Sequence, residues 1–463
     1  MRQKIFQSFP PVSKQDWVDQ AKKDLKGGNF ELQLVSVAPE GFPIHPYYAI
    51  EDTVETQWIK AFDHQINPSQ QVPGLPPRHW VNVVEIAEAD ETAANQEIQL
   101  VLNSGADGLI LTSSEAWDWS KALAGLVLPS VAIWIKPLGE DPLPVLESFS
   151  SWLEQQDLST SDLWGGILWD GLHVAFDRPL QIETSINQLY TVHRLFQSHT
   201  NFKSVCLNST IYGNAGGTAV QELGYGLAAL VELWDGLTEK GLEPKALFSD
   251  LFVLTAVGTD YFMEIAKLKA FRIALYQLAK QYQIEFPAED ILLFAMTSRW
   301  SQSANEPYNN LLRHTTEAMS AIIGGCNAIF VAPHDHSSSF TKRMARNIPI
   351  LLREEGYFDK TLDPAAGSYY IENLIRQLFE EGWELLAKTE QEGGWWKLYL
   401  KHKIQLEVKA SRGLKFQQLM EGAIERLGTP KAVDHPISVK PLPEEEDYQL
   451  KPCSHFLPYE SSL

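Results

Sequence analysis

Cysteine is scarce in this chain of 463 residues, and the three that occur, Cys206, Cys326 and Cys453, are far apart. This spacing excludes a disulfide framework and a thiolate zinc site, and it favours a reducing compartment, so we expect a cytoplasmic protein. Long apolar runs are also lacking. No stretch approaches the roughly 18 apolar residues of a spanning helix, and the N-terminus has no apolar signal-peptide core, so we expect no membrane association.

Basic residues are in deficit, with 38 Lys and Arg against 59 Asp and Glu and a formal net charge of -21. This balance argues against a nucleic-acid partner. Apolar material is plentiful: hydrophobic residues make up 44% of the chain, with 14 Trp, 15 Tyr and 21 Phe, so a large folded core is expected and dominant disorder is excluded. The length fits one large barrel with extensions or about three ordinary domains.

Short apolar runs alternate with helix-length amphipathic segments from Val81 onward. Strict alternation of strand and helix predicts a parallel sheet buried on both faces. The eight predicted strands are Val81 to Ile86, Gly108 to Thr112, Ser130 to Lys136, Gly165 to Asp170, Lys203 to Asn208, Phe248 to Val257, Ile291 to Thr297 and Ala328 to Ala332. Helices are predicted between them, among others over Thr92 to Leu102, Ile182 to Gln197, Thr218 to Thr238, Asp260 to Tyr282 and Tyr308 to Ile323.

Eight such repeats over about 250 residues predict an α/β protein with a closed (β/α)8 TIM barrel, here residues 81–360. An open doubly wound sheet would carry a G-x-G-x-x-G motif after its first strand, and this chain has none there. Residues 1–80 are predicted to form an N-terminal arm with a helix around Ser13 to Lys26. A helical extension (361–427, with helices from Ile371 to Lys388 and Trp396 to about Leu427) and an extended, acidic, Pro-containing tail (428–463) follow.

Polar residues at the carboxyl ends of the predicted strands should meet at the mouth of the barrel, where barrel enzymes carry their chemistry. Ser298-Arg299 can hold a phosphate or carboxylate there, and an internal salt bridge explains the guanidinium equally well. The amides of Asn214 to Thr218 can bind an anion, but an ordinary turn capped by Thr218 is favoured. The mouth residues are Ser113, Lys136, Asp170, Asn208, Ser298, Arg299 and His334.

Three further patterns have a chemical and a structural interpretation. His334-Asp335-His336 offers metal ligands, but no supporting third ligand is evident nearby, and a helix cap formed by Ser337 to Ser339 is favoured, so we predict no metal site. Glu264 and Lys267 are spaced to form a structural ion pair on one helix face. Trp395-Trp396 is interpreted as one buried ring and one ring at an interface.

Several motifs, taken in order, resemble the methylmalonyl-CoA mutase family. The resemblance spans roughly Leu207 to Gly394, and before it Trp17, Asp24 to Gly27 and Pro46-Tyr47 resemble the opening of the family's small, or beta, subunit. The motifs are Asn214-Ala215-Gly216 with Gln221-Glu222-Leu223, Phe262 to Lys267, Pro307 to Arg313 with Glu317-Ala318, and, as the strongest, Asp363 to Glu372 preceded by Arg346-Asn347.

The resemblance implies a (β/α)8 barrel that threads coenzyme A down its axis, and a separate cobalamin-binding domain. Its members convert (R)-methylmalonyl-CoA to succinyl-CoA through radicals made from adenosylcobalamin. Active members carry a His four residues before Ala215-Gly216, where this chain has Ile211, and a Tyr near Leu75, whereas no tyrosine occurs here between Tyr48 and Tyr190. The cobalt-binding D-x-H-x-x-G motif is also missing.

The resemblance therefore implies a non-catalytic small subunit with a filled barrel, paired in a heterodimer with a catalytic large subunit that holds the adenosylcobalamin. It implies no catalytic residue and no cofactor in this chain, and it makes Asn208, Asn214, Ser298 and Arg299 vestigial residues of the mouth. The arm and the helices after Asp363 are the expected contacts. One alternative is an active acyl-CoA mutase that uses a cobalamin domain on another chain. Another is an unrelated barrel hydrolase using His334, Asp335 and His336.

Overall fold

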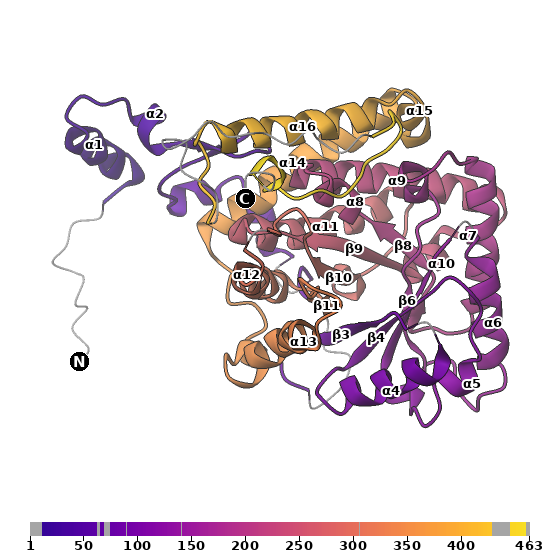
Figure 1. The fold of residues 1–463 in the computed structure, drawn as a ribbon. Helices are drawn as coiled ribbons and strands as arrows, with labels where there is room; N and C mark the ends of the chain where they lie inside the picture. The colour runs from indigo at the N-terminus through magenta and orange to yellow at the C-terminus, as the bar shows by residue number, and fades with distance from the viewer. Residues whose placement is uncertain are drawn as a thin grey trace, which may run out of the picture.

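The predicted α/β barrel is confirmed by a computed structural model that describes residues 12–62, 65–68, 75–88, 90–139, 141–304, 306–427 and 445–459. Its parallel strands lie in the order β7-β6-β5-β4-β3-β11-β10-β9-β8, inside a layer of helices (Figure 1). The strands are β3 (Val81–Ile86), β4 (Gly108–Ser113), β5 (Ala132–Pro137), β6 (Trp164–Ile167), β7 (Phe202–Lys203), β8 (Val205–Asn208), β9 (Leu251–Val257), β10 (Leu292–Thr297) and β11 (Ala328–Phe330).

One segment closes the barrel. β7 pairs with β6 and β8 pairs with β9, so residues 202–208 join both edges of the sheet. β7 and β8 together correspond to the single strand predicted over Lys203 to Asn208. Because a closed parallel barrel is covered outside by helices and filled inside by side chains, its strands are almost continuously apolar, and all seven residues of β9 are buried.

Among the predicted strands, two differ from the observed bounds by three residues at one end. The run from Phe248 starts inside a helix, because Pro244 at the first helical turn favours helix there, and β9 begins only at Leu251. The run from Gly165 leaves the sheet after Ile167, and the Asp170 side chain accepts backbone N–H bonds that turn the chain. The barrel helices are α4 (Glu91–Leu102), α5 (Trp119–Ala122), α6 (Leu143–Leu153), α7 (Ile182–Phe196), α8 (Thr210–Asn214), α9 (Ala219–Glu239), α10 (Pro244–Ser249), α11 (Tyr261–Gln281), α12 (Asn309–Gly324) and α13 (Ser339–Glu354).

The helical extension packs on one side of the barrel. α14 (Tyr369–Gln391) lies against α9 and α11. The single helix predicted from Trp396 to about Leu427 is wrong, since two helices occur there, α15 (Trp395–Leu400) and α16 (Lys403–Met420). The break is at His402, whose φ of 57° is left-handed and incompatible with a continuous right-handed helix. In Figure 1, α16 runs along the top of the molecule next to α14.

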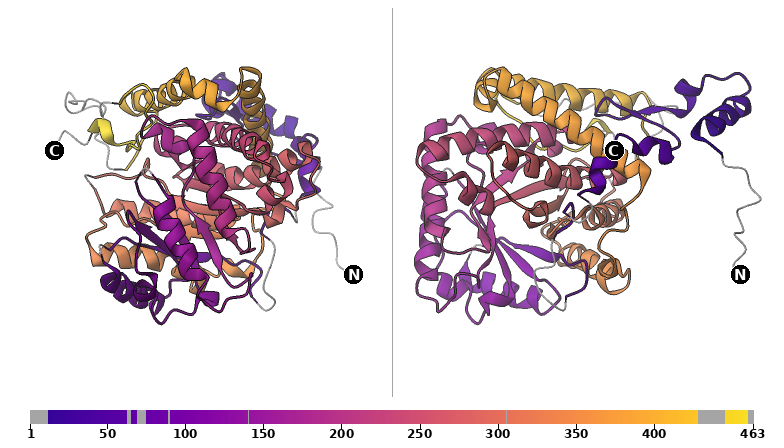
Figure 2. Two further views of the ribbon diagram at one scale, coloured as in Figure 1. Left: turned by 90° about the vertical axis from the view of Figure 1, so that its right-hand side faces the viewer. Right: turned by 180° about the vertical axis from the view of Figure 1, so that it is seen from behind.

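The N-terminal arm projects from the barrel, as Figure 1 and the right-hand view of Figure 2 show. The arm contains α1 (Lys14–Asp24), α2 (Phe30–Leu34), the antiparallel pair β1 (Ser36–Val37) and β2 (Pro43–Ile44), and α3 (Gln57–Lys60). The helix predicted around Ser13 to Lys26 is present as α1, with Ser13 as its N-cap, yet α1 buries no residue. The Trp17 ring stacks on Tyr47 with 4.8 Å between ring centroids. α1 is therefore held by local contacts, whereas later parts of the arm pack on the rest of the molecule: Phe42 and Ile59 belong to the main core, and the Trp58 ring lies 5.5 Å from Phe379 of α14 between centroids.

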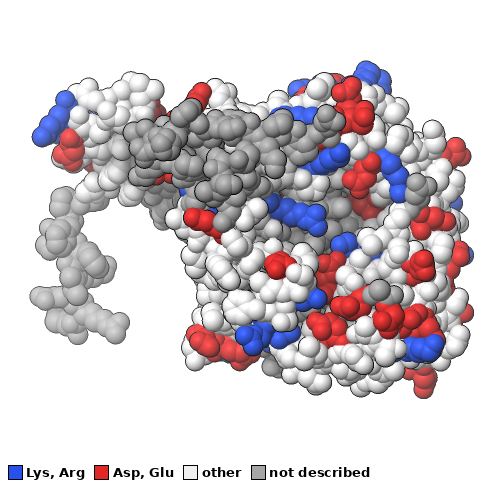
Figure 3. Space-filling model, in the orientation of Figure 1, with Lys and Arg blue, Asp and Glu red and all other residues white. Residues whose placement is uncertain are grey.

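The tail is not simply extended, because its described part folds back on the barrel. The backbone N–H of Cys453 donates to the Asn214 carbonyl at 2.9 Å, and the His455 ring stacks on Trp300 at 4.7 Å. Residues 428–444 lie outside the described residues. None of the helices described is long and apolar enough to cross a membrane. On the face seen in Figure 3, acidic and basic side chains are interspersed.

Candidate functional site at the barrel mouth

Aromatic side chains fill the barrel interior. Trp134 and Phe294 are 2% and 0% exposed, and their rings lie 4.8 Å apart between centroids. Phe252 and Phe330 are buried in the same cluster. Such rings bury roughly 150–250 Å² each, so a few of them suffice to fill a barrel of this size. These rings fill the middle of the barrel, where the resemblance implied a filled interior.

A cavity of about 720 Å³ lies at the opposite end of the barrel from the mouth. Residues at the amino ends of the strands line it, including Val81, Leu292 and Ala328, and Trp134 lines it as well. Since the chemistry of (β/α)8 enzymes is found at the carboxyl ends of the strands, this cavity is not at the usual position of an active site.

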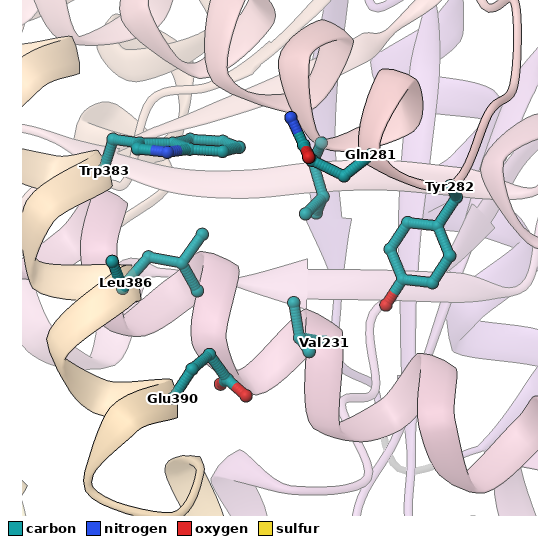
Figure 4. Close-up of a pocket in the computed structure, with 8 residues that line it drawn as sticks. Val231, Gln281, Tyr282, Trp383, Leu386 and Glu390 are labelled. Atoms are coloured by element: carbon teal, nitrogen blue, oxygen red, sulfur yellow. The ribbon is translucent and has the colours of Figure 1, made fainter.

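A second hollow, of about 370 Å³, lies outside the barrel between α9, α11 and α14. Figure 4 shows Trp383 and Leu386 of α14 opposite Val231 of α9 and Tyr282 beside α11. Partial burial raises the pKa of Glu390 at its edge to about 7. Its lining is mostly apolar and brings together no nucleophile with a base.

Lys136 lies at the mouth as predicted, but its charge is already compensated. Its ammonium forms an ion pair with Glu85 at 2.8 Å, and the Thr112 hydroxyl donates to the same carboxylate at 2.8 Å. Burial would raise the pKa of Glu85, but the attraction and hydrogen bond of Lys136 outweigh it, and the pKa is lowered. The Ser113 hydroxyl is bound locally, to the carbonyl of Glu115 at 2.6 Å. The ion pair and the hydrogen bond from Thr112 therefore stabilise one another.

A buried chain of hydrogen bonds connects the barrel to α15. The Asp170 carboxylate lies 2.7 Å from His173 Nδ1, and His173 Nε2 lies 2.8 Å from the Tyr212 hydroxyl. Trp395 Nε1 donates to that hydroxyl at 2.8 Å. Because an indole N–H can only donate, the Tyr212 hydroxyl donates to His173 Nε2, and His173 Nδ1–H donates to Asp170. With these roles, every side-chain N–H and O–H group of the four residues has an acceptor.

The hydrogen-bonded side chains are of types found in catalytic sites, but they are not accessible to a ligand. His173 and Tyr212 are 3% and 0% exposed, and both imidazole nitrogens are occupied. Burial would raise the pKa of Asp170, but His173 and the backbone N–H groups of Asn208 and His173 lower it, and burial raises the pKa of Tyr212. The sequence pointed to Asp170 but not to its partners. The only signal for His173 is its spacing of three residues from Asp170.

The structure brings together some of the predicted mouth residues. The Ser298 hydroxyl donates to Asn214 Oδ1 at 3.1 Å, and the Arg299 backbone N–H donates to the same oxygen at 2.8 Å. Asn208 lies apart from them and accepts from the Thr210 hydroxyl at 2.6 Å. Ile211 packs half-buried against the main core. The Arg299 side chain is exposed and forms no ion pair with the residues that the structure describes.

The structural interpretations hold for the loops before α9 and α13. The Thr218 hydroxyl caps α9 in a reciprocal pair with Gln221. Ser338 caps α13, and the Asp335 carboxylate accepts from the Ser337 N–H at 2.9 Å. His334 lies edge-on to Tyr308. Within the described ranges, no group of three or more His, Cys, Asp or Glu side chains is placed to hold a metal ion.

The predicted pair of Glu264 and Lys267 is present and belongs to a larger buried cluster. Lys267 Nζ lies 2.7 Å from Glu264 and 2.9 Å from Glu222. Burial would lower the pKa of Lys267, but the two carboxylates raise it, so the ammonium stays charged. Trp395 is fully buried, so it is the buried ring of the predicted pair, and Trp396 is half-buried.

Comparison with known proteins agrees with the resemblance. The family model described as methylmalonyl-CoA mutase matches residues 89–448. The chain belongs to the methylmalonyl-CoA mutase family. The methylmalonyl-CoA mutase small subunit of Porphyromonas gingivalis is 31% identical over 439 residues, covering 92% of this chain and 71% of that protein. The small subunit of Streptomyces virginiae is 28% identical, covering 83% and 65%.

Mitochondrial members of the family match less of their own length. The mitochondrial methylmalonyl-CoA mutase of Homo sapiens is 27% identical over 438 residues, covering 85% of this chain and 57% of that protein. The chain thus spans between 57% and 71% of the length of these three relatives.

Proposed function

We propose that this chain is the non-catalytic small subunit of a heterodimeric, adenosylcobalamin-dependent methylmalonyl-CoA mutase and that it stabilises a catalytic large subunit. The observation that carries the proposal is the filled barrel. Active members thread coenzyme A down the axis, whereas Trp134, Phe252 and Phe294 are packed together in this interior. Filling the barrel adds buried apolar area, which stabilises the fold, and removes the passage that a thioester needs.

Among the residues that the structure describes, the side chain at the position of the family's His cannot polarise a thioester. A carbonyl is activated by a donor aimed at the oxygen on which negative charge develops. Ile211 stands at the position of the family's His and has no donor. His173 and Tyr212 are the nearby alternatives, and their polar atoms are bound to Asp170, to Trp395 and to each other.

The described residues do not fit the cofactor of the family. Adenosylcobalamin supplies the radicals in active members, but here the segment around Cys453 and His455 lies over the loops that follow β8 and β10, hydrogen-bonded to Asn214 and Trp300. No step of the reaction is assigned to this chain. In this proposal the cofactor is bound by the large subunit.

The arm and α16 offer apolar surface for a partner. Leu32 and Val37 in the arm are 84% and 71% exposed. Leu406 and Leu414 of α16 are also exposed. Exposed apolar side chains gathered on a projecting element favour contact with another protein. We assign this surface to the large subunit.

The proposal is tested by co-expression of the tagged chain with an untagged large subunit. We expect a one-to-one complex, and Leu32→Asp should weaken association at least tenfold because a carboxylate would be buried in the interface. Leu100→Asp, the same change at an exposed leucine on α4, is the matched control and should leave association unchanged.

The purified chain should show no turnover of methylmalonyl-CoA when it is mixed with a cobalamin-binding protein. Turnover in this assay would replace the proposal with the active acyl-CoA mutase that borrows its cobalamin domain. Failure to bind any large subunit would refute the stabilising role.

A further inference from the structure

The arm fills one end of the groove between α11 and α14. The ring of Trp58 lies 5.5 Å from Phe379 of α14, and the ring of Phe62 lies 5.0 Å from Tyr276 of α11, both measured between centroids. Trp58 and Phe62 are four residues apart, so both can face the same side of one helical turn. One pair of aromatic side chains of the arm therefore contacts both helices.

The hollow of about 370 Å³ continues this groove beyond the arm. The Trp383 ring lies 5.8 Å from Phe379 and one turn farther along α14, and it lines the hollow. Leu278 follows on α11, Leu386 on α14, and Val231 of α9 forms the third side (Figure 4). The part of the chain that the structure describes thus covers the groove at the arm and leaves it open from Trp383 onward.

The open end of the groove carries uncompensated negative charge. Partial burial and repulsion from Glu232 and Asp235 of α9 raise the pKa of Glu390 to about 7. Burial likewise raises the pKa of Glu232 and that of Asp235. Glu232 accepts the Trp396 backbone N–H at 3.1 Å, but none of the three carboxylates forms an ion pair within the described ranges. A cation placed here would relieve this repulsion.

The filled end shows which kind of segment the groove accepts. There, Arg376 of α14 forms an ion pair with Glu55 of the arm at 3.2 Å, next to the contact between Trp58 and Phe379. The arm therefore combines apolar side chains on one turn with a charge opposite to that of the groove. Because the open end has a similar apolar wall and an acidic edge, a complementary segment has the same apolar pattern with basic side chains.

We propose that the open end of this groove binds a short amphipathic helix of a partner protein. The helix presents apolar side chains one turn apart to Leu278, Trp383 and Leu386, and Lys or Arg side chains to Glu390 and its acidic neighbours. A second copy of this chain fits less well, because two chains of net charge -21 repel each other.

This surface is formed by α9, α11 and α14, whereas the surface assigned to the large subunit is formed by the arm and α16. The inference therefore goes beyond the proposed function, and its failure would leave the proposed role of the subunit intact.

The test is a fluorescence anisotropy titration of a labelled, synthetic amphipathic helix of leucine and lysine with the full chain at pH 8, where Glu390 is ionised. We expect saturable one-to-one binding. A peptide with Glu in place of Lys, and one with Ser in place of Leu, should each bind at least tenfold more weakly. Equal binding of either peptide would overturn the proposed chemistry of the partner.

Two variants locate the binding site. Ala387→Trp fills the hollow from its half-exposed wall without a change of charge, and Glu390→Lys reverses one charge at its edge. Each should weaken binding of the leucine-lysine helix at least tenfold. Both positions reach the surface, so both variants should fold. Full binding by both variants would place the peptide elsewhere and overturn the site.

Glu381→Lys is the matched control, because Glu381 is exposed on α14 and does not line the hollow. It should bind the leucine-lysine helix as the unmodified chain does. A loss equal to that of Glu390→Lys would show unspecific attraction to an acidic protein and overturn the proposal. Sedimentation velocity tests the other occupant: a dimer of the unmodified chain that Ala387→Trp abolishes would identify a second copy in the groove and overturn the assignment of the partner.

Discussion

Replacing Tyr212 by phenylalanine tests whether the buried chain from Asp170 to Trp395 is structural. The substitution removes one hydroxyl and leaves the ring, so it creates almost no cavity. It deprives two buried groups of their partner: the Trp395 indole N–H and His173 Nε2. An unsatisfied buried polar group costs about 1–3 kcal/mol, so we expect the free energy of unfolding to fall by about 2–6 kcal/mol. Urea denaturation measures this change.

Tyr308→Phe is the matched control, because the same atom is removed from a side chain that is 68% exposed. It should change the free energy of unfolding by less than about 0.5 kcal/mol. Trp395→Phe combined with Tyr212→Phe should cost less than the sum of the single variants, since both act on one hydrogen bond. A stability loss below about 0.5 kcal/mol for Tyr212→Phe would refute the structural role. His173 would then have to be reconsidered as a catalytic group.

Three further predictions concern stability. Phe294→Ala should destabilise the chain by about 3–5 kcal/mol in urea denaturation. Calorimetry of the unmodified chain should detect no binding of a thioester, and binding would contradict a vestigial barrel. Burial raises the pKa of Glu317 to about 8, so between about pH 4 and pH 8 the folded chain retains a proton that the unfolded chain has lost, and stability should fall as the pH rises across this window and level off above it. Glu317→Gln should flatten this fall, and an unchanged pH profile would contradict the assignment. Gly165→Ala should prevent folding, measured as loss of soluble protein, because φ is 128° and a Cβ would lie 1.8 Å from the Ile133 carbonyl oxygen; normal expression would refute it.

The fold was largely predictable because the signals for strands and helix starts are local. The predicted strand from Val81 to Ile86 has the bounds of β3, and Thr218 caps α9 as its residue type suggests. The break between α15 and α16 was not predictable in the same way. Histidine adopts left-handed conformations more readily than most residues, but one histidine does not by itself predict a break. The position of α15 depends on contacts with distant residues, such as the Tyr399 hydroxyl that donates to the Ala175 carbonyl at 2.7 Å.

The sequence by itself determined the barrel, the family and the absence of the family's His at Ile211, because the order of residues carries periodicity and motifs directly. Only the tertiary structure decided which polar groups are free. Tyr212 meets His173 across 39 residues and Trp395 across 183 residues, and Arg78 lies near cations almost two hundred residues away. Closure of the barrel and docking of the extension bring these groups together, and a side chain's available hydrogen bonds depend on such distant neighbours.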